Sequence, residues 1–351
     1  MYVEENKPLA RFTTFDIGGP ARWFVEAANE VDVADAAAWA KAKSLPLFVL
    51  GGGSNLLVAD SGFDGLVLHI GIKGITTYNE SDGALYAVGA GEEWDQFVQQ
   101  AVNAGSAGIE CLSGIPGTVG GTPVQNVGAY GQEVASSIAH VRAYDLGEER
   151  FVDFSTAECG FGYRRSRFNS SDPGRFVVTR VDYRLTPGGS PTLHYADLQR
   201  EFAGVPDPSL AQVAAAVRRI RRSKSMLLVE GDPDGRSAGS FFKNPVVHDE
   251  LVEQIASIAG KQPPRFPAGR EDQQVGWVKV PAAWLIEQAG FSKGFARGSA
   301  AISSRHTLAL INRGGAKAAD ILALADEITA AVASRFAIRL EREPVLLGFK
   351  S

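Results

Sequence analysis

The sequence contains little that would support disulfide bonds, a metal centre or a membrane anchor. Its 351 residues include only two cysteines, Cys111 and Cys159, and five scattered histidines that form no HExxH pattern. Neither a disulfide framework nor a metal site is therefore predicted. The longest run without a charged residue, 111–132, is broken by glycines and prolines and cannot span a membrane.

The N-terminus also lacks the pattern of a targeting signal. MYVEENKP has acidic residues where a signal peptide has basic and then apolar ones. With 35 basic and 40 acidic residues, the net charge of −5 argues against a nucleic acid or an anionic membrane as partner. We therefore expect a soluble, cytoplasmic protein. We also expect it to be a monomer whose partners are small molecules.

One basic cluster, Arg218 to Lys224, interrupts this balance of charge. It closes an expected helix over 207–224, in which Asp207 is the N-cap and apolar residues recur at helical spacing. Cations in the last turn of a helix complement its dipole. A solvated helix end therefore explains the cluster without a ligand.

Glycine is in excess, at 39 residues where an average composition of about 7% would give roughly 25. An α/β unit comes first, with strands expected over 21–27, 45–50 and 65–70 and a helix over 31–43. The region after it has short strands, long glycine-rich loops and one amphipathic helix over 92–105.

Longer elements return in the C-terminal third. Helices are expected over 281–290 and 318–336, followed by a last strand over 336–349. Because a single core rarely grows beyond about 250–300 residues, the chain should hold two to three domains. We place their boundaries at 1–72 (with the tail 345–351), 73–225 and 226–345.

Two glycine-rich loops are candidates for ligand binding. GGGSN, at 51–55, follows an expected strand, where successive backbone N–H groups can converge on an anion. It has neither the last glycine of G-x-G-x-x-G nor the G-K-[ST] of a P-loop. On its own it is better explained by a turn that ends the strand.

The second loop, SGIPGTVGGTPVQNVGAYG at 113–131, has six glycines in nineteen residues and no charged side chain. Bare backbone suits a large ligand whose phosphates accept hydrogen bonds from N–H groups and whose rings need close approach. A dinucleotide cofactor fits this loop better than a single phosphate does. A buried structural turn is the alternative.

At these loops the sequence resembles the UDP-N-acetylenolpyruvoylglucosamine reductases, in the subclass with an extra tyrosine-bearing segment. GGGSN, IPGTVGG and QNVGAYG resemble the flavin-binding segments of that family. The resemblance continues through FGYRRSRF (161–168), LHYADL (193–198), GSFFKNP (239–245), AAWLIEQAG (282–290) and LEREPVLLG (340–348). It implies an α+β fold of the vanillyl-alcohol-oxidase/p-cresol-methylhydroxylase type, with two FAD-binding subdomains and a C-terminal α/β substrate domain.

The resemblance also implies cofactors and an activity. NADPH would reduce FAD, and FAD N5 would pass a hydride to UDP-N-acetylglucosamine enolpyruvate, giving UDP-N-acetylmuramate for peptidoglycan synthesis. The implied FAD-binding residues are Gly51, Gly52, Gly53, Ser54, Asn55, Ile115, Pro116, Gly117, Gly120, Gly121, Asn126, Gly128, Ala129 and Tyr130. No separate NADPH motif is visible, which is compatible with two substrates that take turns in one cleft.

Three residues are implied to be catalytic. Hydride addition to an alkene conjugated to a carboxylate leaves an enolate, which needs stabilising charge and a proton donor. By resemblance Ser240 donates the proton, while Arg164 and Glu343 polarise the carboxylate. An aliphatic hydroxyl is a weak acid that needs exclusion of water, which Phe241 and Phe242 can provide. RSAGSFFKNP alone would favour a polar turn whose serine caps backbone groups.

The other two catalytic candidates lie among surface-like charges. In FGYRRSRF, a strand would turn Tyr163 and Arg165 to one face and Arg164 to the other, and a guanidinium suits a carboxylate. Glu341 is a rival of Glu343, whose spacing to LLG matches the final strand of the family.

The resemblance assigns the substrate to five side chains, Tyr163, Tyr195, Lys224, Asn244 and His306. Tyr195 would close over the diphosphate, although a packing role explains it equally well. Lys224 and Asn244 match positions near the nucleotide and the enolpyruvyl group. The segment 225–238 has no residue-by-residue match to the family.

Three rival functions are compatible with parts of the sequence. Ser240 and Lys243 satisfy the S-x-x-K pattern of serine acyl-transferases, but Pro245 would break the helix that this chemistry needs. Another FAD oxidase or dehydrogenase of the same superfamily is the main alternative. A relative that binds flavin without turnover is the third.

Overall fold

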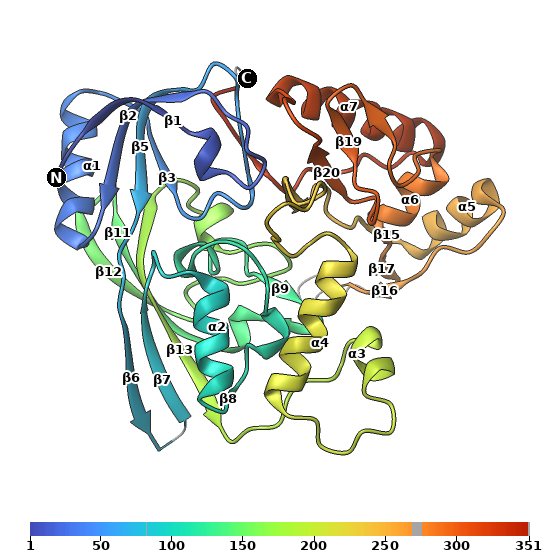
Figure 1. Cartoon of the computed structure of the whole chain (residues 1–351), viewed down its shortest axis with the longest axis horizontal. Coiled ribbons are helices and arrows are strands. Elements are labelled where there is room, and N and C mark those ends of the chain that lie inside the picture. The colour runs from blue at the N-terminus through green and yellow to red at the C-terminus, as the bar shows by residue number, and fades with distance from the viewer. Residues whose placement is uncertain (82, 269–275, 350–351) are drawn as a thin grey trace. The chain divides into compact units, whose positions relative to one another are not determined.

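The computed structural model describes residues 1–81, 83–268 and 276–349 (Figure 1). The chain divides into two compact units, and each combines segments that lie far apart in the sequence. Unit 1 comprises 1–7, 21–52 and 64–222, and unit 2 comprises 8–20, 53–63 and 223–351. The three expected domains, 1–72, 73–225 and 226–345, stay a prediction.

The first sheet of unit 1 confirms the α/β unit expected at the N-terminus. Its strand order is β1-β2-β5-β3, and α1 follows β2. The bounds are β1 Glu4–Pro8, β2 Pro20–Ala27, β3 Leu47–Leu50, β5 Phe63–Ile70 and α1 Glu30–Ala42. Asn29 starts the helix, because its side chain accepts a hydrogen bond from the Asp32 N–H at 3.0 Å. The strand β1 was not expected.

A larger antiparallel sheet completes unit 1, in the order β12-β11-β13-β7-β6, with β8 paired to β13. The bounds are β6 Ile75–Glu80, β7 Gly83–Gly89, β8 Ser106–Ala107, β11 Ile138–Asp145, β12 Arg150–Ser155 and β13 Phe176–Pro187. The long β13 holds the sheet together, since it pairs with β11, β7 and β8.

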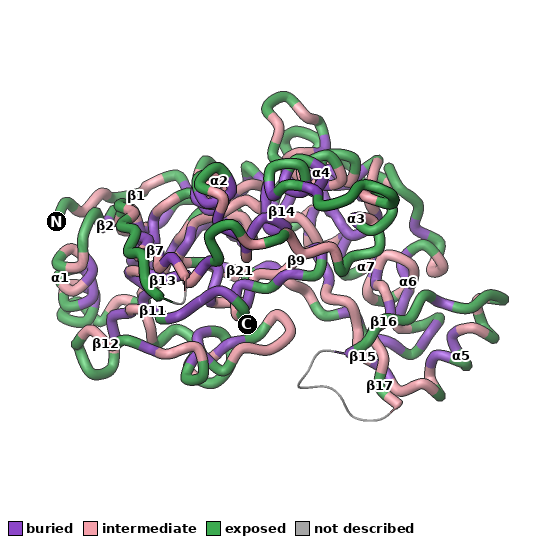
Figure 2. The backbone as a smooth tube through the Cα atoms, turned by 90° about the horizontal axis from the view of Figure 1, so that it is seen from below, coloured by how far each residue is buried: buried purple, intermediate pink, exposed green. Residues whose placement is uncertain are grey.

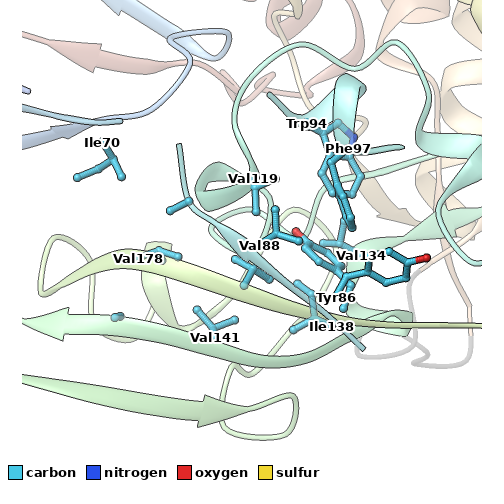
Figure 3. Close-up of a cluster of buried hydrophobic side chains, with 14 of the residues drawn as sticks. Ile70, Tyr86, Val88, Trp94, Phe97, Val119, Val134, Ile138, Val141 and Val178 are labelled. Atoms are coloured by element: carbon cyan, nitrogen blue, oxygen red, sulfur yellow. The ribbon is translucent and has the colours of Figure 1, made fainter. Parts of the chain in front are cut away.

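The core of unit 1 forms where α2, Trp94–Asn103, packs on this sheet (Figure 3). Phe97 is 1% exposed, and its ring centroid lies 5.8 Å from that of Tyr86, 5.9 Å from Trp94 and 5.1 Å from Tyr183. This helix confirms the one expected over 92–105, and its apolar face is the buried one. Buried and exposed residues likewise alternate along α1 (Figure 2).

The start of α4, Leu210–Ser223, corrects the sequence prediction. Asp207 is not its N-cap, because its φ of 46° places it in a left-handed turn before the helix. Ser209 takes that role: its Oγ accepts from the Gln212 N–H at 3.2 Å, and its N–H donates to Gln212 Oε1 at 2.8 Å. This reciprocal pair is a capping box. Unit 1 also contains the short elements α3 Ala196–Glu201, β9 Gly128–Ala129 and β10 Gln132–Glu133.

In its described residues, unit 2 is built on the antiparallel sheet β14-β20-β19-β18, with three helices and two smaller sheets. The bounds are β14 Ser237–Ser240, β18 Ala296–Arg297, β19 Ala300–Ile302, β20 Ala309–Asn312, α5 Asp249–Ala259, α6 Ala282–Gln288 and α7 Ala318–Phe336. β15 Val246–His248, β17 Trp277–Lys279 and β16 Phe266–Pro267 form one small sheet, and β4 Leu56–Val58 pairs in parallel with β21 Val345–Leu347.

The end of the chain differs from the expected strand over 336–349. Phe336 is 1% exposed and belongs to the buried face of α7, which ends where Ala337 takes a φ of 56°. Of the rest, only Val345–Leu347 is a strand. In the part of the chain that the structure describes, no helix is both long and apolar enough to cross a membrane.

Replacement of Phe97 by alanine should destabilise unit 1. The change removes a fully buried ring from three aromatic contacts, which typically costs about 3–5 kcal/mol. We expect a lower denaturant midpoint for the loss of far-ultraviolet circular dichroism. Val31→Ala on α1 is the control, since Val31 is 68% exposed, and its midpoint should stay near that of the parent. Equal midpoints for both variants would contradict the packing described here.

Candidate active site

The glycine-rich loop 113–121 is fastened to the start of α2 by backbone hydrogen bonds. Trp94 donates twice, from its backbone N–H to the Gly117 carbonyl at 3.1 Å and from its indole Nε1 to the Leu112 carbonyl at 3.2 Å. Val119 N–H donates to the Glu92 carbonyl at 2.9 Å. These hydrogen bonds fix the loop against the start of α2, although the loop has no charged side chain of its own.

Several predicted cofactor residues are glycines because neighbouring atoms lie too close to their Cα to leave room for a side chain. A Cβ on Gly52 would lie 2.6 Å from Gly117 Cα, and one on Gly51 would lie 2.8 Å from Thr118 Oγ1. A Cβ on Gly120 would lie 2.7 Å from Ala90 Cβ. A Cβ on Gly121, by contrast, would meet nothing within 4 Å. Packing within unit 1 therefore requires a glycine at 52 and 120 but not at 121.

The second half of GGGSN belongs to unit 2. Gly53 has a φ of 59°, and a Cβ there would lie 1.7 Å from the Phe12 carbonyl oxygen. The Ser54 carbonyl accepts from Thr14 Oγ1 at 3.5 Å, and Asn55 Nδ2 donates to the Glu343 carbonyl at 3.2 Å. These contacts connect this part of the loop to the segment of a predicted catalytic residue.

QNVGAYG forms the turn before and within the β9–β10 hairpin, and its asparagine is buried. Asn126 Nδ2 donates to Glu133 Oε2 and to the Gly162 carbonyl, both at 3.0 Å, and Oδ1 accepts from the Ala135 N–H at 3.1 Å. These bonds give Asn126 a structural role next to FGYRRSRF. Ala129 packs against the core of unit 1, as does Ile115 of the neighbouring loop, while Pro116 is half-buried.

Arg164 lies in a tight turn, so the expectation of a strand over FGYRRSRF is wrong. Gly162 pairs with Arg165 across the turn, and Arg164 has a φ of 55°. The side chain nevertheless reaches a predicted cofactor segment, because Nη1 donates to the Gly128 carbonyl at 3.1 Å. The guanidinium also lies over the Tyr163 ring, 5.6 Å from its centroid. Unit 1 thus brings Tyr163, Arg164 and Gly128 together.

Tyr195 precedes α3 and is 37% exposed. Its ring lies nearly perpendicular to that of Tyr130, which is 8% exposed, with the centroids 5.2 Å apart. The contact therefore joins the buried Tyr130 of QNVGAYG to the accessible Tyr195 of LHYADL. A role of Tyr195 in closing over a substrate stays a prediction.

A buried carboxylate that the sequence analysis missed holds the segment before Tyr195. Glu110 is 0% exposed, and its Oε1 accepts from Gln132 Nε2 and from the Thr192 N–H, both at 2.8 Å. Its Oε2 accepts from the Gly108 N–H at 2.8 Å. The only sign of it in the sequence is a charged residue directly before the uncharged run 111–132. Two of the partners of Glu110, Gln132 and Thr192, are distant in sequence and could not be inferred from it.

In unit 2 the strand that carries Ser240 runs beside the segment of Glu343. Ser240 ends β14 and pairs with Ala309, and the next residue, Phe241, accepts a hydrogen bond at its carbonyl from the Glu343 N–H at 2.9 Å. Phe241 and Phe242 are 0% and 1% exposed, with ring centroids 5.3 Å apart. The segments of Ser240 and Glu343 are therefore adjacent, and a backbone hydrogen bond joins them next to two buried rings.

The surroundings of Glu341 differ from those of Glu343. Its side chain is 76% exposed and forms a salt bridge with Lys243 at 3.4 Å. Glu343 is half-buried, and both its N–H and its carbonyl are bonded. This difference favours Glu343 as the site residue. Because Ser240 ends a strand rather than beginning a helix, the geometry also disagrees with an S-x-x-K acyl-transferase.

His306 lies in a cationic part of unit 2. Burial, and then the charges of Lys224 and Lys293, lower the pKa of His306 to about 4. Its Nδ1 accepts from the Leu308 N–H at 3.1 Å, so the neutral ring carries its proton on Nε2 and can donate there. Lys293 was not among the predicted residues. Asn244 has a structural partner, since its Oδ1 accepts from the Ala282 N–H at 2.9 Å and caps α6.

The unmatched segment 225–238 is anchored by a second buried acid. Asp234 is 5% exposed, and its Oδ2 accepts from Ser303 Oγ and from the Ser304 N–H, both at 2.8 Å. Burial acts to raise the pKa of Asp234, but hydrogen bonds from Ser303 and Ser304 hold it below its usual value. This residue, also missed from the sequence, fixes the turn that carries His306.

Neither cysteine is among the predicted site residues. Cys111 and Cys159 are both buried and free. Among the described residues no group of three or more histidine, cysteine or acidic side chains could hold a metal ion.

Comparison with known proteins gives matches over nearly the whole chain. The family model for the C-terminal domain of UDP-N-acetylenolpyruvoylglucosamine reductase matches residues 232–347, and the model described as FAD binding domain matches 21–153. The reductases of that name from Streptomyces coelicolor and Thermobifida fusca are each 46% identical to this chain over 98% of its length, covering 90% and 97% of their own. The crystal structure of the Thermus caldophilus reductase aligns over 99% of both chains, with 28% identity and a TM-score of 0.67.

The two adjacent glycines of the second loop should respond differently to alanine. Gly120→Ala forces the new methyl group against Ala90, and overpacking of this kind costs about 1–3 kcal/mol. Gly121→Ala meets open space and should change the free energy of unfolding by less than about 0.5 kcal/mol. Denaturant unfolding of both variants measures the difference. A Gly121→Ala protein as unstable as Gly120→Ala would refute the assigned packing.

His306 should make the protein less stable as the pH falls. Its pKa of about 4 in the folded protein is below the value of about 6.5 in an unfolded chain. Between these values only the unfolded state binds the proton, so stability declines from pH 6.5 towards pH 4, by about 1–3 kcal/mol.

His306→Gln should remove this part of the decline when unfolding midpoints are compared at pH 7.0, 5.5 and 4.5. His140→Gln, at an exposed position on β11, is the control and should keep the parent profile. An unchanged slope for His306→Gln would mean that the imidazole is accessible to protons in the folded state.

Proposed function

The chain belongs to the UDP-N-acetylenolpyruvoylglucosamine reductase family, and we propose that it reduces UDP-N-acetylglucosamine enolpyruvate to UDP-N-acetylmuramate with NADPH. The observation that carries the proposal is the 46% identity to reductases of that name over 98% of the chain. Membership confirms the family and the α+β, FAD-binding fold class that the glycine-rich loops and GSFFKNP predicted. The protein is an oxidoreductase and a flavoprotein of peptidoglycan precursor synthesis.

The residues of unit 1 fit an FAD cofactor. The loop 113–121 offers uncharged backbone held in a fixed conformation. Apart from the adjoining chain, no atom of the protein lies within 4 Å of the position that a Cβ on Gly121 would take, so a ligand can approach the backbone there. Such a surface accepts phosphates and a flat ring system at close range. Bound FAD would supply hydride transfer, taking the hydride from NADPH and delivering it to the substrate.

Ser240 is proposed as the proton donor to the carbon next to the substrate carboxylate. Its hydroxyl lies at the end of β14, directly before two buried phenylalanines, and Gly239 leaves open space beside it. A hydroxyl shielded from water can transfer a proton to an enolate that is more basic than itself. The neighbouring Glu343, fixed through its backbone, is proposed to act on the same group.

Arg164 is proposed to hold the substrate carboxylate. A guanidinium can donate two parallel hydrogen bonds to a carboxylate and stabilise the charge that develops there. Its contact with the Gly128 carbonyl orients the side chain from the predicted flavin segment.

The sugar nucleotide is proposed to contact a further set of residues. Lys224 and His306 offer a cation and a neutral donor, and Tyr163 and Tyr195 offer aromatic surface. Asn244 would present its remaining amide group. We further propose that NADP is the electron acceptor of the reverse reaction, and that the protein is a cytoplasmic monomer without nucleic-acid or membrane partners.

Flavin absorbance under anaerobic conditions tests the function. Bleaching by NADPH and recovery on addition of UDP-N-acetylglucosamine enolpyruvate would demonstrate both half-reactions. Bleaching without recovery would favour another flavin oxidase or dehydrogenase of the same superfamily. A protein that cannot be reconstituted with FAD would refute the proposal.

Ser240→Ala should separate the two half-reactions. The variant should bind FAD and be bleached by NADPH at the parent rate, while turnover falls by about 10²–10⁴-fold, as is typical for loss of a general acid. Stopped-flow absorbance and steady-state assays measure the two steps. Ser237→Ala, which removes a hydroxyl from the same strand, is the control and should retain turnover. Near-normal turnover of Ser240→Ala would exclude this serine as the donor.

A further inference from the structure

Gly114 is held at both of its backbone polar atoms by charged side chains from two helices. Its N–H donates to Asp95 Oδ1 on α2 at 2.5 Å, and its carbonyl accepts from Arg221 Nε on α4 at 3.0 Å. Arg218, one turn before Arg221, donates to the other oxygen of Asp95. The four residues form one continuous cluster within unit 1, which we call the Gly114 clamp.

The clamp contains a buried cation that its partners must compensate. Arg221 is only 8% exposed, and burial lowers its pKa, opposed by its interactions with Tyr130 and Asp95. A buried guanidinium is tolerated only where opposite charge and hydrogen bonds replace water. Asp95 supplies the opposite charge for Arg221, and it also accepts a hydrogen bond from Arg218. The hydrogen bonds of Arg221 itself go to the Gly114 carbonyl and to Tyr130. The expectation of a solvated helix end is therefore wrong for Arg218 and Arg221, whereas Arg219 and Arg222 of the same cluster are exposed.

The position of the clamp connects it to both predicted flavin segments. Gly114 has a φ of 73° and directly precedes IPGTVGG. Arg221 also forms a side-chain hydrogen bond with Tyr130 of QNVGAYG. The same guanidinium therefore contacts the start of one segment and the aromatic residue of the other. Any shift of Arg221 would change the spacing between them.

We propose that Asp95 and Arg218 are positioning residues for FAD, which act through Gly114 and Arg221 to fix the spacing of the segments 115–121 and 126–130. This inference rests on the proposed flavin-binding role of those segments. Neither side chain is assigned a contact with the cofactor or with the substrate. Their effect should appear in how long FAD stays bound and in its absorption spectrum.

Asp95→Asn tests the carboxylate without changing the size of the side chain. Its oxygen can still accept from Gly114, but its amide group would point donors at Arg218. We expect FAD to leave the diluted holoprotein at least about tenfold faster, measured as the rise of free-flavin fluorescence, and the visible flavin bands to shift. The KM for the sugar nucleotide should change less than the FAD release rate does.

Arg218→Ala should also speed FAD release, and Arg218→Lys should restore most of the parent rate, because a charge at this position is what Asp95 needs. Arg219→Ala is the matched control. Arg219 is the next residue on α4 but pairs with Glu201 at the surface, so its loss should leave FAD release unchanged.

Release rates and spectra equal to those of the parent in both Asp95→Asn and Arg218→Ala would overturn the proposal. An equal effect of Arg219→Ala would also overturn it, since the change would then reflect the general charge of α4. If Asp95→Asn fails to fold, the comparison of Arg218→Ala with Arg218→Lys decides. A parent protein that never holds FAD would instead refute the proposed function, and the two failures are thus distinguishable.

Discussion

The contact of bare backbone between GGGSN and the loop 113–121 is the constraint on which unit 1 depends. Gly52 and Gly117 approach so closely that a methyl group on Gly52 would overlap the Cα of Gly117. Glycines make this approach possible, but they lose more conformational entropy on folding than other residues do, which lowers the stability of the folded state. The structure compensates by fastening the second loop to α2 and α4, with backbone bonds from Trp94 and Val119 and with the Gly114 clamp.

In unit 2 the segments of Ser240 and Glu343 lie side by side, although Glu343 is not part of a regular strand. Two buried rings, Phe241 and Phe242, anchor the serine side, and the backbone of Glu343 bonds to Phe241 and accepts from Asn55. The catalytic candidates thus lie on chain that is fixed by burial and by main-chain bonds. The neighbouring Glu341, by contrast, forms a surface ion pair with Lys243.

The spacing of apolar residues in the sequence predicted the helices and strands that depend mainly on interactions between residues close in sequence. The apolar spacing over 318–336 predicted α7 to the residue, and the alternation of strands with a helix predicted β2, α1, β3 and β5. Elements set by a few backbone angles were missed: the left-handed Asp207 moved the start of α4, and Arg164 turned an expected strand into a tight turn. The buried acids Glu110 and Asp234 and the half-buried Asp95 were also missed, because each bonds to groups distant in sequence. The family resemblance supplied the site candidates that no periodicity could have found.

The state of the two cysteines has a practical consequence for experiments on this protein. Cys111 is buried with its thiol directed to the Thr192 carbonyl at 3.2 Å, and burial raises the pKa of Cys159 to about 12. Both thiols are therefore protonated and shielded from alkylating reagents in the folded protein. A cysteine introduced at an exposed position would be the single reactive thiol, and a fluorophore or spin label could be attached there without first removing the native cysteines.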